Sequence, residues 1–471
     1  MELTHLIRKA ARILKTPFLV LDLSYVEENY FRLKNSIENN EIFYAVKANS
    51  HEKILEMLRD LGCSFDSASR GEINKLLGLG IDPKKISFGN TIKKEEDIRY
   101  AWENGIEYFA VDSEMEVEKI ARNAPGAKVY GRIAMSSNDA DWPLSGKFGT
   151  DVDHVIEILK YANRKGLVPY GVSFHVGSQS YNKHKWKEAI LSVSKVFEKL
   201  AEKGIYLKLV NLGGGIPVKH VKPIPEVEEI GHVVNEAIHE YLGWVDGLRI
   251  FSEPGRSMVG NAGVMASKVV LRSRKGTQDW VYLDVGVFHG LMETIENFRY
   301  EVVVDGKENH ETVSMTLAGP SCDSVDTIYD EVELPVDIDY QDIVYFINTG
   351  AYTIEYASPH FNGITPPELY TVEELEVLVE KAEEELRLSY IYNRSLIEAS
   401  IDPLVTIGPD GKITDVNKST EKVTGFNRDE LIGTDFSDYF TEPEKAREGY
   451  TRVFQEGMVL DYPLEIIHKN V

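Results

Sequence analysis

A regular alternation of short apolar runs with longer amphipathic stretches, between residues 42 and 256, most constrains how this chain can fold. In the longer stretches, such as 152–165 and 185–203, apolar residues recur at the three-four spacing of one helix face. Eight such strand–helix units, over about 200 residues, predict a (β/α)8 barrel rather than an open sheet. The expected strands are residues 42–47, 64–68, 86–90, 108–112, 128–134, 170–176, 208–212 and 249–253.

Polar residues or glycines stand at the ends of all eight expected strands. Barrel enzymes build their active sites at the carboxyl ends of the strands, so these residues predict an active site there. Lys47 is the most informative, because a lysine desolvated at a strand end can lose its proton and attack a carbonyl carbon. The ordinary alternative is a lysine that reaches into water. The residues are Lys47, Asp66 with Ser69, Asn90, Asp112, Arg132, His175 with Ser178, Gly213, Gly214 and Gly215, and Glu253 with Arg256.

Several of these positions favour a flat ligand that carries a phosphate. Glycines 213–215 let backbone N–H groups approach an anion, and Arg256 adds a positively charged fork. A tight turn and a surface ion pair are their ordinary alternatives. Glu253 ends an apolar run, where a carboxylate needs a positive or proton-bearing partner such as a pyridinium nitrogen. His175 either stacks on a flat ligand or is a satisfied core histidine. No cluster of His and Cys has metal-site spacing, so no metal is expected.

The remainder of the chain predicts further domains. Runs that alternate or are apolar throughout, from 264 to 347, indicate a β-rich domain, which the strand-like run at 18–22 is expected to join. Residues 371–395 predict a glutamate-rich helix, either a short coiled coil or a solvated helix. We therefore expect an amino-terminal segment that joins the β domain, a barrel, a β-rich domain, a helical linker and a final module. Their boundaries are 1–22, 23–256, 257–368, 369–396 and 397–471.

Composition narrows the classes of partner. With a net charge of -24, the chain is too acidic for broad binding to nucleic acid or to anionic membranes. It contains no run of about 18 apolar residues, so no membrane span is expected. The two cysteines, Cys63 and Cys322, imply no disulfide framework, and a cytoplasmic location is expected.

Seven motifs occur in the order seen in pyridoxal-phosphate-dependent ornithine decarboxylases. Each motif alone is weak, but the ordered set is specific. Over about residues 15–365 the chain resembles the ornithine, lysine and diaminopimelate decarboxylase family, above all its bacterial-type ornithine enzymes. The motifs are Tyr-Ala-Val-Lys-Ala-Asn at 44–49, Phe-Asp-Ser-Ala-Ser at 65–69, Phe-His-Val-Gly-Ser at 174–178, Leu-Gly-Gly-Gly at 212–215, Ser-Glu-Pro-Gly-Arg at 252–256, Gly-Pro-Ser-Cys-Asp-Ser-Val-Asp at 319–326 and Gly-Ala-Tyr-Thr at 350–353.

The resemblance implies pyridoxal 5'-phosphate (PLP) as the cofactor. Lys47 would hold it covalently, His175 would stack on its ring with Asp66 and Arg132 nearby, and Glu253 would keep its pyridine nitrogen protonated. The residues implied for phosphate binding are Ser178, Gly213, Gly214, Gly215, Gly255, Arg256 and Tyr352.

The resemblance also implies a head-to-tail homodimer with shared active sites. Cys322 and Asp323 would come from the second subunit, and Cys322 would return a proton to the substrate α-carbon. A small buried apolar residue is the ordinary alternative for Cys322. Lys147 would bridge the subunits to Asp326.

The expected substrate is a basic L-amino acid, because Asp323 after Cys322 resembles the carboxylate that receives a distal ammonium in ornithine and lysine decarboxylases. The second carboxylate of eukaryotic ornithine enzymes falls at Asn297 here. We assign its role to Glu296, with Glu293 as the alternative, and either could be a solvated surface residue. The expected reaction converts L-ornithine to putrescine and carbon dioxide, in polyamine synthesis. A lysine or broad-range decarboxylase is the first alternative, and a non-catalytic regulator, either antizyme-inhibitor-like or PAS-linked, is the second.

The final module resembles the early half of a PAS sensory domain, on residues 417–433. A hairpin is expected before it, at Asp410-Gly411. PAS domains normally continue with further strands beyond the length found here, so a partial module is expected, with its ligand undetermined.

Overall fold

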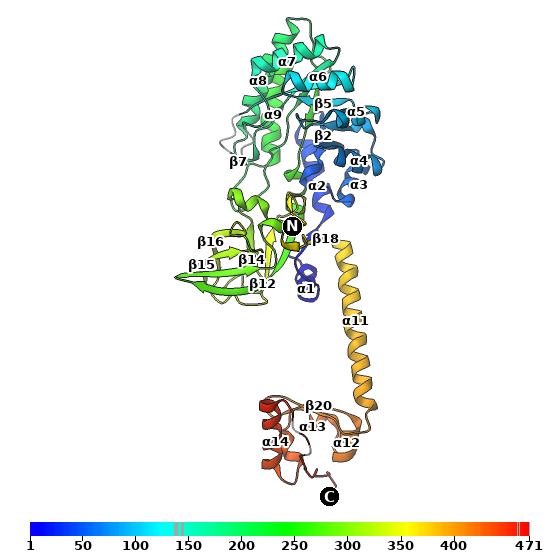
Figure 1. Ribbon diagram of the computed structural model, residues 1–471, viewed down its shortest axis with the longest axis vertical. Helices are drawn as coiled ribbons and strands as arrows, with labels where there is room; N and C mark the ends of the chain where they lie inside the picture. The colour runs from blue at the N-terminus through cyan, green and yellow to red at the C-terminus, as the bar shows by residue number, and fades with distance from the viewer. Residues whose placement is uncertain (136–139, 143–145, 459, 461, 471) are drawn as a thin grey trace. The chain divides into compact units, whose positions relative to one another are not determined.

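The computed structural model describes residues 1–135, 140–142, 146–458, 460 and 462–470 (Figure 1). The chain divides into two compact units, Met1–Val377 and Leu378–Val471. The first unit contains a closed barrel and a mixed β-sheet. The second contains an antiparallel hairpin with helices.

Eight parallel strands of the described chain close into a barrel, which confirms the fold class expected from the sequence. The barrel closes where residues 250–252 of one strand pair with residues 40–42 of another. Each strand overlaps its expected run but ends one or two residues earlier, so most of the polar residues follow the strands, whereas Asp66 and Arg132 lie within them. The strands are β2 (Asn40–Ala45), β3 (Ser64–Ser67), β4 (Ile86–Phe88), β5 (Tyr108–Val111), β6 (Lys128–Ile133), β8 (Val168–Phe174), β10 (Leu209–Asn211) and β11 (Arg249–Ser252).

Helices cover the outside of the barrel (Figure 1). Ser69, directly after β3, caps the next helix by accepting a hydrogen bond from the backbone N–H of Glu72. Ser113 and Asp151 cap two further helices in the same way. These helices thus begin within a few residues of a strand or turn, which keeps the connecting residues at the mouth of the barrel. The helices are α2 (Leu23–Ser36), α3 (Glu52–Asp60), α4 (Arg70–Gly78), α5 (Glu95–Glu103), α6 (Glu114–Asn123), α7 (Val152–Arg164), α8 (His184–Ala201) and α9 (Val227–Leu242).

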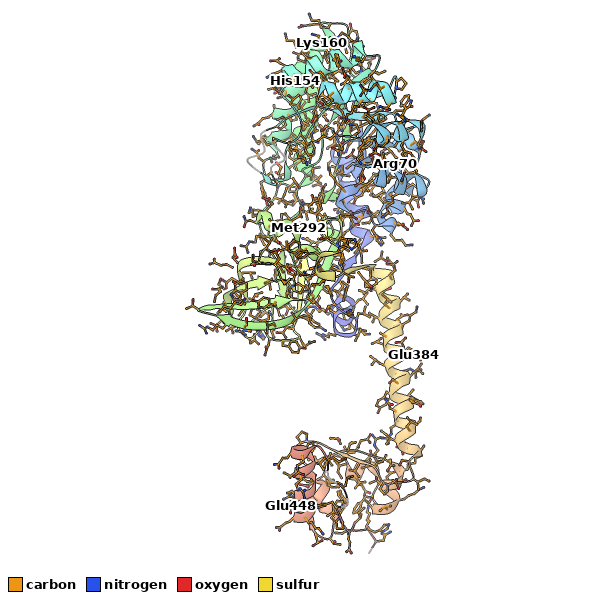
Figure 2. All side chains as sticks on the ribbon, viewed as in Figure 1. Arg70, His154, Lys160, Met292, Glu384 and Glu448 are labelled. Carbon is orange, nitrogen blue, oxygen red and sulfur yellow. The ribbon has the colours of Figure 1, made fainter. Side chains whose placement is uncertain are left out.

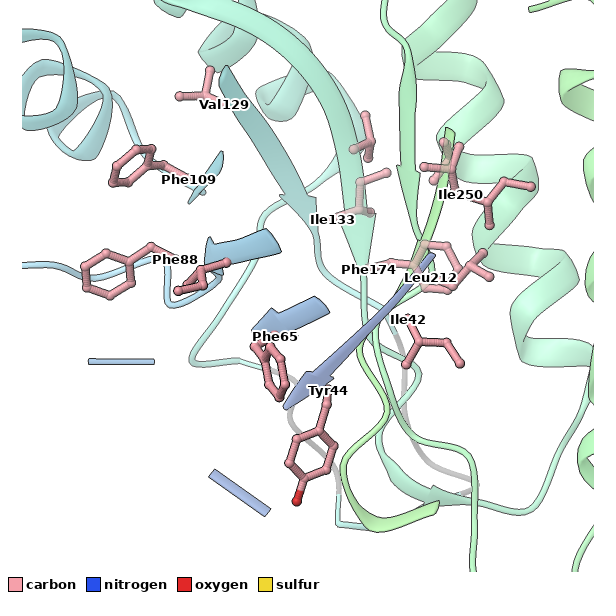
Figure 3. Packing of buried hydrophobic residues seen from close by; sticks show 14 of the residues in the cluster. Ile42, Tyr44, Phe65, Phe88, Phe109, Val129, Ile133, Phe174, Leu212 and Ile250 are labelled. Atoms are coloured by element: carbon pink, nitrogen blue, oxygen red, sulfur yellow. The ribbon is translucent and has the colours of Figure 1, made fainter. Parts of the chain in front are cut away.

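Strand β2 shows how side chains alternate across the barrel wall. Ile42 and Tyr44 join the large core between the strands and the helices, part of which Figure 3 shows. Phe43 belongs to a separate cluster and stacks on Phe251 with ring centroids 4.1 Å apart. That cluster contains Phe43, Tyr108, Ala110, Tyr130, Leu209 and Phe251. Its side chains fill the barrel interior below the carboxyl ends of the strands, as expected for a packed (β/α)8 core.

The mixed sheet of the first unit pairs strands from both ends of that unit. β1 (Phe18–Leu21) pairs antiparallel with β12 and parallel with β18. Two strands, β16 and β18, were not expected from the sequence; in β16, Asp330, Glu331 and Glu333 interrupt the apolar pattern. Strand β16 pairs only with β15 among the described strands, so it is an edge strand, where exposed charges are common. The other strands are β12 (Gly263–Lys275), β13 (Gln278–Leu283), β14 (Glu301–Val304), β15 (Thr312–Ala318), β16 (Thr327–Pro335), β17 (Ile343–Ile347) and β18 (Glu368–Thr371).

The second unit is a small α+β module. The expected hairpin is present as β19 (Val405–Ile407) and β20 (Ile413–Val416), and Gly411 supplies a positive φ of 77° in its turn. Asn417 caps the helix that follows and donates from its amide to the backbone carbonyl of Asp402. The helices are α11 (Val372–Ala399), which begins in the first unit, α12 (Lys418–Thr424), α13 (Arg428–Leu431) and α14 (Pro443–Glu456).

Candidate active site

A cavity of about 270 Å³ opens at the carboxyl ends of the barrel strands. Residues that follow β2, β3, β4, β6, β8, β10 and β11 line it, together with residues of the mixed-sheet region. Asp112, after β5, does not line it; its carboxylate accepts a hydrogen bond from the backbone N–H of Gly149, beside the lining residue Phe148. The lining residues expected from the sequence are Lys47, Asp66, Asn90, Arg132, His175, Ser178, Gly214, Gly215, Glu253, Gly255, Arg256 and Tyr352.

Lys47 lies in a short 3-10 turn, η1 (Val46–Ala48), and not at the last position of a strand. The turn is hydrogen-bonded to the segment that carries the lining residue Tyr352, because the backbone N–H of Tyr352 donates to the carbonyl of Ala48. The Asn49 amide donates to the carbonyl of Gly350 at 2.8 Å. The Lys47 side chain is exposed in the single chain, so this chain alone does not supply the desolvation expected from the sequence.

Two carboxylates face the same part of the cavity. Asp66 is buried and accepts a hydrogen bond from the Ser87 hydroxyl at 2.8 Å. Burial raises the pKa of the Asp66 carboxyl well above its ordinary value, and the negative charge of Glu253 raises it further. Glu253 accepts a hydrogen bond from the Asn211 amide at 2.5 Å. A cation or a proton donor placed between the two carboxylates would relieve this repulsion.

The sequence did not single out the glycine that makes room for Asp66. A Cβ atom at Gly89 would lie 2.1 Å from Asp66 Oδ1. Any larger residue there would displace the carboxylate. Its position directly after strand β4, in Phe-Gly-Asn, is the signal that could have identified it.

His175 presents a neutral ring. Burial lowers the pKa of its imidazole well below the ordinary value, and the positive charges of Arg132 and Lys47 lower it further. Its Nδ1 accepts a hydrogen bond from the backbone N–H of Gly177 at 3.0 Å, so the ring proton resides on Nε2. A neutral, planar side chain of this kind can stack on a flat ligand.

Glycines and Arg256 form the other end of the cavity. Cβ atoms would lie 2.6 Å from the Glu253 carbonyl oxygen at Gly214 and 2.8 Å from the Tyr352 hydroxyl at Gly255. Arg256 is buried, and its Nη2 lies 3.5 Å from the Ser178 hydroxyl. Arg256 Nε is buried and has no hydrogen-bond partner among the described residues. Free backbone and guanidinium donors suit an anion.

Two features at this end were not foreseen. Tyr352 has a φ of 55°, a left-handed backbone that is costly for a bulky residue and is common at functional sites. Glu293 lines the cavity and pairs with Arg256, whereas the sequence offered it only as an alternative substrate contact. Phe148 and Tyr356 also line the cavity, although the sequence motifs had not assigned either residue to the site.

The remaining expected residues lie elsewhere in the single chain. Cys322 and Asp323 are exposed and do not line the cavity, nor does Gly213. Glu296 is exposed at the end of η5 (Met292–Glu296), whose first residue is labelled in Figure 2.

The two residues expected to bridge subunits differ in burial. Lys147 is exposed, whereas Asp326 is buried. The carboxylate of Asp326 accepts hydrogen bonds from the backbone N–H groups of Val287 and Ser321. Asp326 therefore anchors the loop that carries Cys322.

The second unit holds a separate, largely apolar cavity of about 340 Å³. Its lining offers hydroxyl groups from Thr420, Thr424 and Tyr439 but no ionisable group with an ordinary pKa near neutrality.

Within the described residues, no group of His, Cys, Asp and Glu could hold a metal ion. None of the helices searched there is both long and apolar enough to cross a membrane.

Comparison with known proteins identifies relatives of both parts of the chain. The model for the pyridoxal binding domain of pyridoxal-dependent decarboxylases matches residues 23–260, and the PAS fold model matches residues 392–459. Lysine/ornithine decarboxylase of Selenomonas ruminantium is 34% identical over 361 residues, 76% of this chain and 90% of that protein. Ornithine decarboxylase of Rattus norvegicus is 33% identical over 375 residues, 76% of this chain and 81% of that protein. The crystal structure of SrLDC with PLP and cadaverine superposes with a TM-score of 0.73 at 30% identity, covering 83% of this chain and 98% of that one.

Asp66→Asn is expected to raise the unfolding midpoint temperature of the cofactor-free protein at pH 8. Because burial raises the folded-state pKa of Asp66, the folded state binds its proton more tightly than the unfolded state. The associated stability is present below the unfolded pKa of about 3.9 and is lost as pH rises through the folded pKa. Asparagine removes the charge and keeps an oxygen acceptor for Ser87. Differential scanning calorimetry at pH 8 and pH 4 measures the difference in unfolding midpoint between Asp66→Asn and the wild-type protein, and this difference should be smaller at pH 4.

Asp246→Asn, at an exposed aspartate, is the control and should leave the midpoint unchanged at both pH values. A lower midpoint for Asp66→Asn at pH 8, or a gap that persists at pH 4, would contradict the assignment of a strained buried charge.

Proposed function

This chain belongs to the pyridoxal-dependent decarboxylases, and from that membership we propose that it decarboxylates a basic L-amino acid, with L-ornithine as the preferred substrate. The products are then putrescine and carbon dioxide, which places the reaction in polyamine synthesis. One observation carries the proposal: a single cavity collects an exposed lysine, a pair of carboxylates and an anion-binding end.

The described residues of the cavity match the functional groups of PLP. Arg256 Nε is a buried donor without a partner, and Gly214 and Gly255 leave no room for side chains, so this end suits the phosphate. Asp66 and Glu253 suit the protonated pyridine nitrogen. Lys47 suits the aldehyde. When bound, PLP supplies an electron sink for the pair left on the substrate α-carbon as carbon dioxide departs.

The protein contributes electrostatics and position. Asp66 and Glu253 hold a proton on the ring nitrogen, because each carboxylate gains from a neighbouring cation. Because burial lowers the pKa of His175, its imidazole does not take up that proton, and the neutral ring would stack on the cofactor. The Lys47 amine is exposed at the mouth of the cavity, where the α-amine of an incoming amino acid can replace it.

The active unit in this proposal is a homodimer with shared sites. In the single chain, Lys47 is exposed and Cys322 lies outside the cavity, so a second subunit is needed to cover the site and to bring a Cys322 thiol to it. We assign proton delivery to the partner subunit's Cys322 and binding of the distal ammonium to the partner subunit's Asp323. An ion pair between Lys147 and the partner subunit's Asp326 is proposed to join the subunits.

The preference for ornithine rests on chemistry at the distal end of the substrate. A carboxylate at position 323 suits an ammonium group on a short chain. Ornithine and lysine differ by one methylene, which is worth only about 1–3 kcal/mol in a binding site, so some activity on lysine is expected. A non-catalytic regulator is not favoured, because Lys47, Glu253, Arg256 and Cys322 are all retained.

Carbon dioxide release from L-ornithine, L-lysine, L-arginine and meso-diaminopimelate, with added PLP, tests this proposal. We expect the highest kcat/KM with L-ornithine and a value about ten- to a hundredfold lower with L-lysine. Equal values for the two would establish the broad-range alternative. No release from any of the four would contradict decarboxylation of basic amino acids.

Mixing two inactive variants tests the shared sites. Lys47→Ala and Cys322→Ala proteins, each with little activity alone, should regain about a quarter of wild-type activity after subunit exchange. Half of the dimers are then hybrids, and each hybrid contains one site with both residues intact. Each variant mixed with itself is the control. No recovery despite demonstrated exchange would contradict a site built from two subunits.

A further inference from the structure

Glu293 and Arg256 form a buried ion pair within the proposed cofactor site. Their side chains are 3% and 5% exposed, respectively. Arg256 Nη1 donates to Glu293 Oε2 at 2.8 Å, and Nη2 donates to Oε1. The pair is bidentate, so it fixes the plane of the guanidinium as well as its position.

The ion pair uses one edge of the guanidinium and leaves another edge free. Glu293 takes the Nη1–Nη2 edge. Nε is buried without a partner among the described residues, and Nη2 lies 3.5 Å from the Ser178 hydroxyl. A guanidinium has five N–H donors in a fixed fork, so it can bind a carboxylate on one edge and a phosphate on the next.

Glu293 is itself held by the mixed-sheet region. The Tyr300 hydroxyl donates to Glu293 Oε2 at 3.2 Å. The rings of Phe298 and Tyr352 lie 4.7 Å and 4.9 Å from Arg256 Cζ and enclose the guanidinium. Residues outside the barrel thus determine where a barrel residue points.

This geometry decides between the two roles open to Glu293. A carboxylate that recognises the distal ammonium of the substrate needs free acceptor sites and a side chain that the substrate can reach, whereas the Glu293 side chain is only 3% exposed. Both oxygens of Glu293 already accept hydrogen bonds from Arg256, and one also accepts from Tyr300. Removing either charge of a buried pair leaves the other uncompensated, so a change that draws Glu293 away from Arg256 is costly.

We propose that Glu293 is a positioning residue for the cofactor phosphate: it holds one edge of Arg256 so that the Nε edge faces the phosphate beside Ser178. The proposal rests on PLP binding in this cavity and adds a residue to it. It also removes Glu293 from the groups that can select among basic amino acids, which leaves that selection to Glu296 and to the partner subunit's Asp323.

Glu293→Gln tests the proposal through cofactor affinity, measured on the full-length chain by absorbance titration without amino acid. Loss of the charge-assisted pair should raise the Kd for PLP about ten- to a hundredfold. The Kd for pyridoxal, which has the same ring and aldehyde but no phosphate, should not change. A purely structural role would weaken both ligands alike. Glu333→Gln, at an exposed glutamate of β16, is the matched control and should leave both values unchanged.

Tyr300→Phe provides a milder second variant if Glu293→Gln fails to fold. It removes only the hydrogen bond to Glu293 and should raise the Kd for PLP severalfold, again without effect on pyridoxal. Parallel weakening of pyridoxal, or an unchanged Kd for PLP with a raised KM for ornithine, would overturn the proposal. Failure of the proposed reaction would appear separately, as tight PLP binding without release of carbon dioxide.

Discussion

The burial of the Asp66 carboxylate, with Glu253 lining the same cavity, is the constraint on which the rest of the site depends. Each carboxylate has one side-chain hydrogen-bond donor in the described chain, from Ser87 and Asn211 respectively. Burial and their mutual repulsion raise the pKa of Asp66, so the pair favours a proton or a cation in its midst. A protonated ring nitrogen meets that need and becomes the electron sink that decarboxylation requires.

Hydrogen-bond donors characterise the other end of the cavity. Arg256 and the glycine backbone at 214–215 line it, and Glu293 pairs with one edge of the guanidinium while Nε has no partner among the described residues. An anionic group of a ligand therefore finds a donor at this end, and a protonated group finds the carboxylates of Asp66 and Glu253. His175, which is kept neutral, can contact a flat ligand without adding charge to the cavity.

Periodicity was enough to predict the barrel, because strands buried on both faces and helices with one apolar face leave distinct patterns along the chain. Because barrel enzymes place their active sites at the carboxyl ends of the strands, the positions of the predicted strand ends then identified most of the residues that line the cavity. Contacts distant in sequence were not predictable in this way: Glu293 lies 37 residues from its partner Arg256 and looks like a surface residue in its own segment. The sequence left open whether Lys47 is desolvated or reaches into water, since its exposure depends on the 3-10 turn and on what covers the cavity mouth.

Borohydride treatment of the PLP-loaded protein, followed by peptide mapping, tests the central claim most directly. The account predicts a pyridoxyl label on one peptide, the one that contains Lys47, and no label in Lys47→Ala. A label on a different lysine, or none in the wild-type protein, would contradict the assignment of this cavity as the cofactor site.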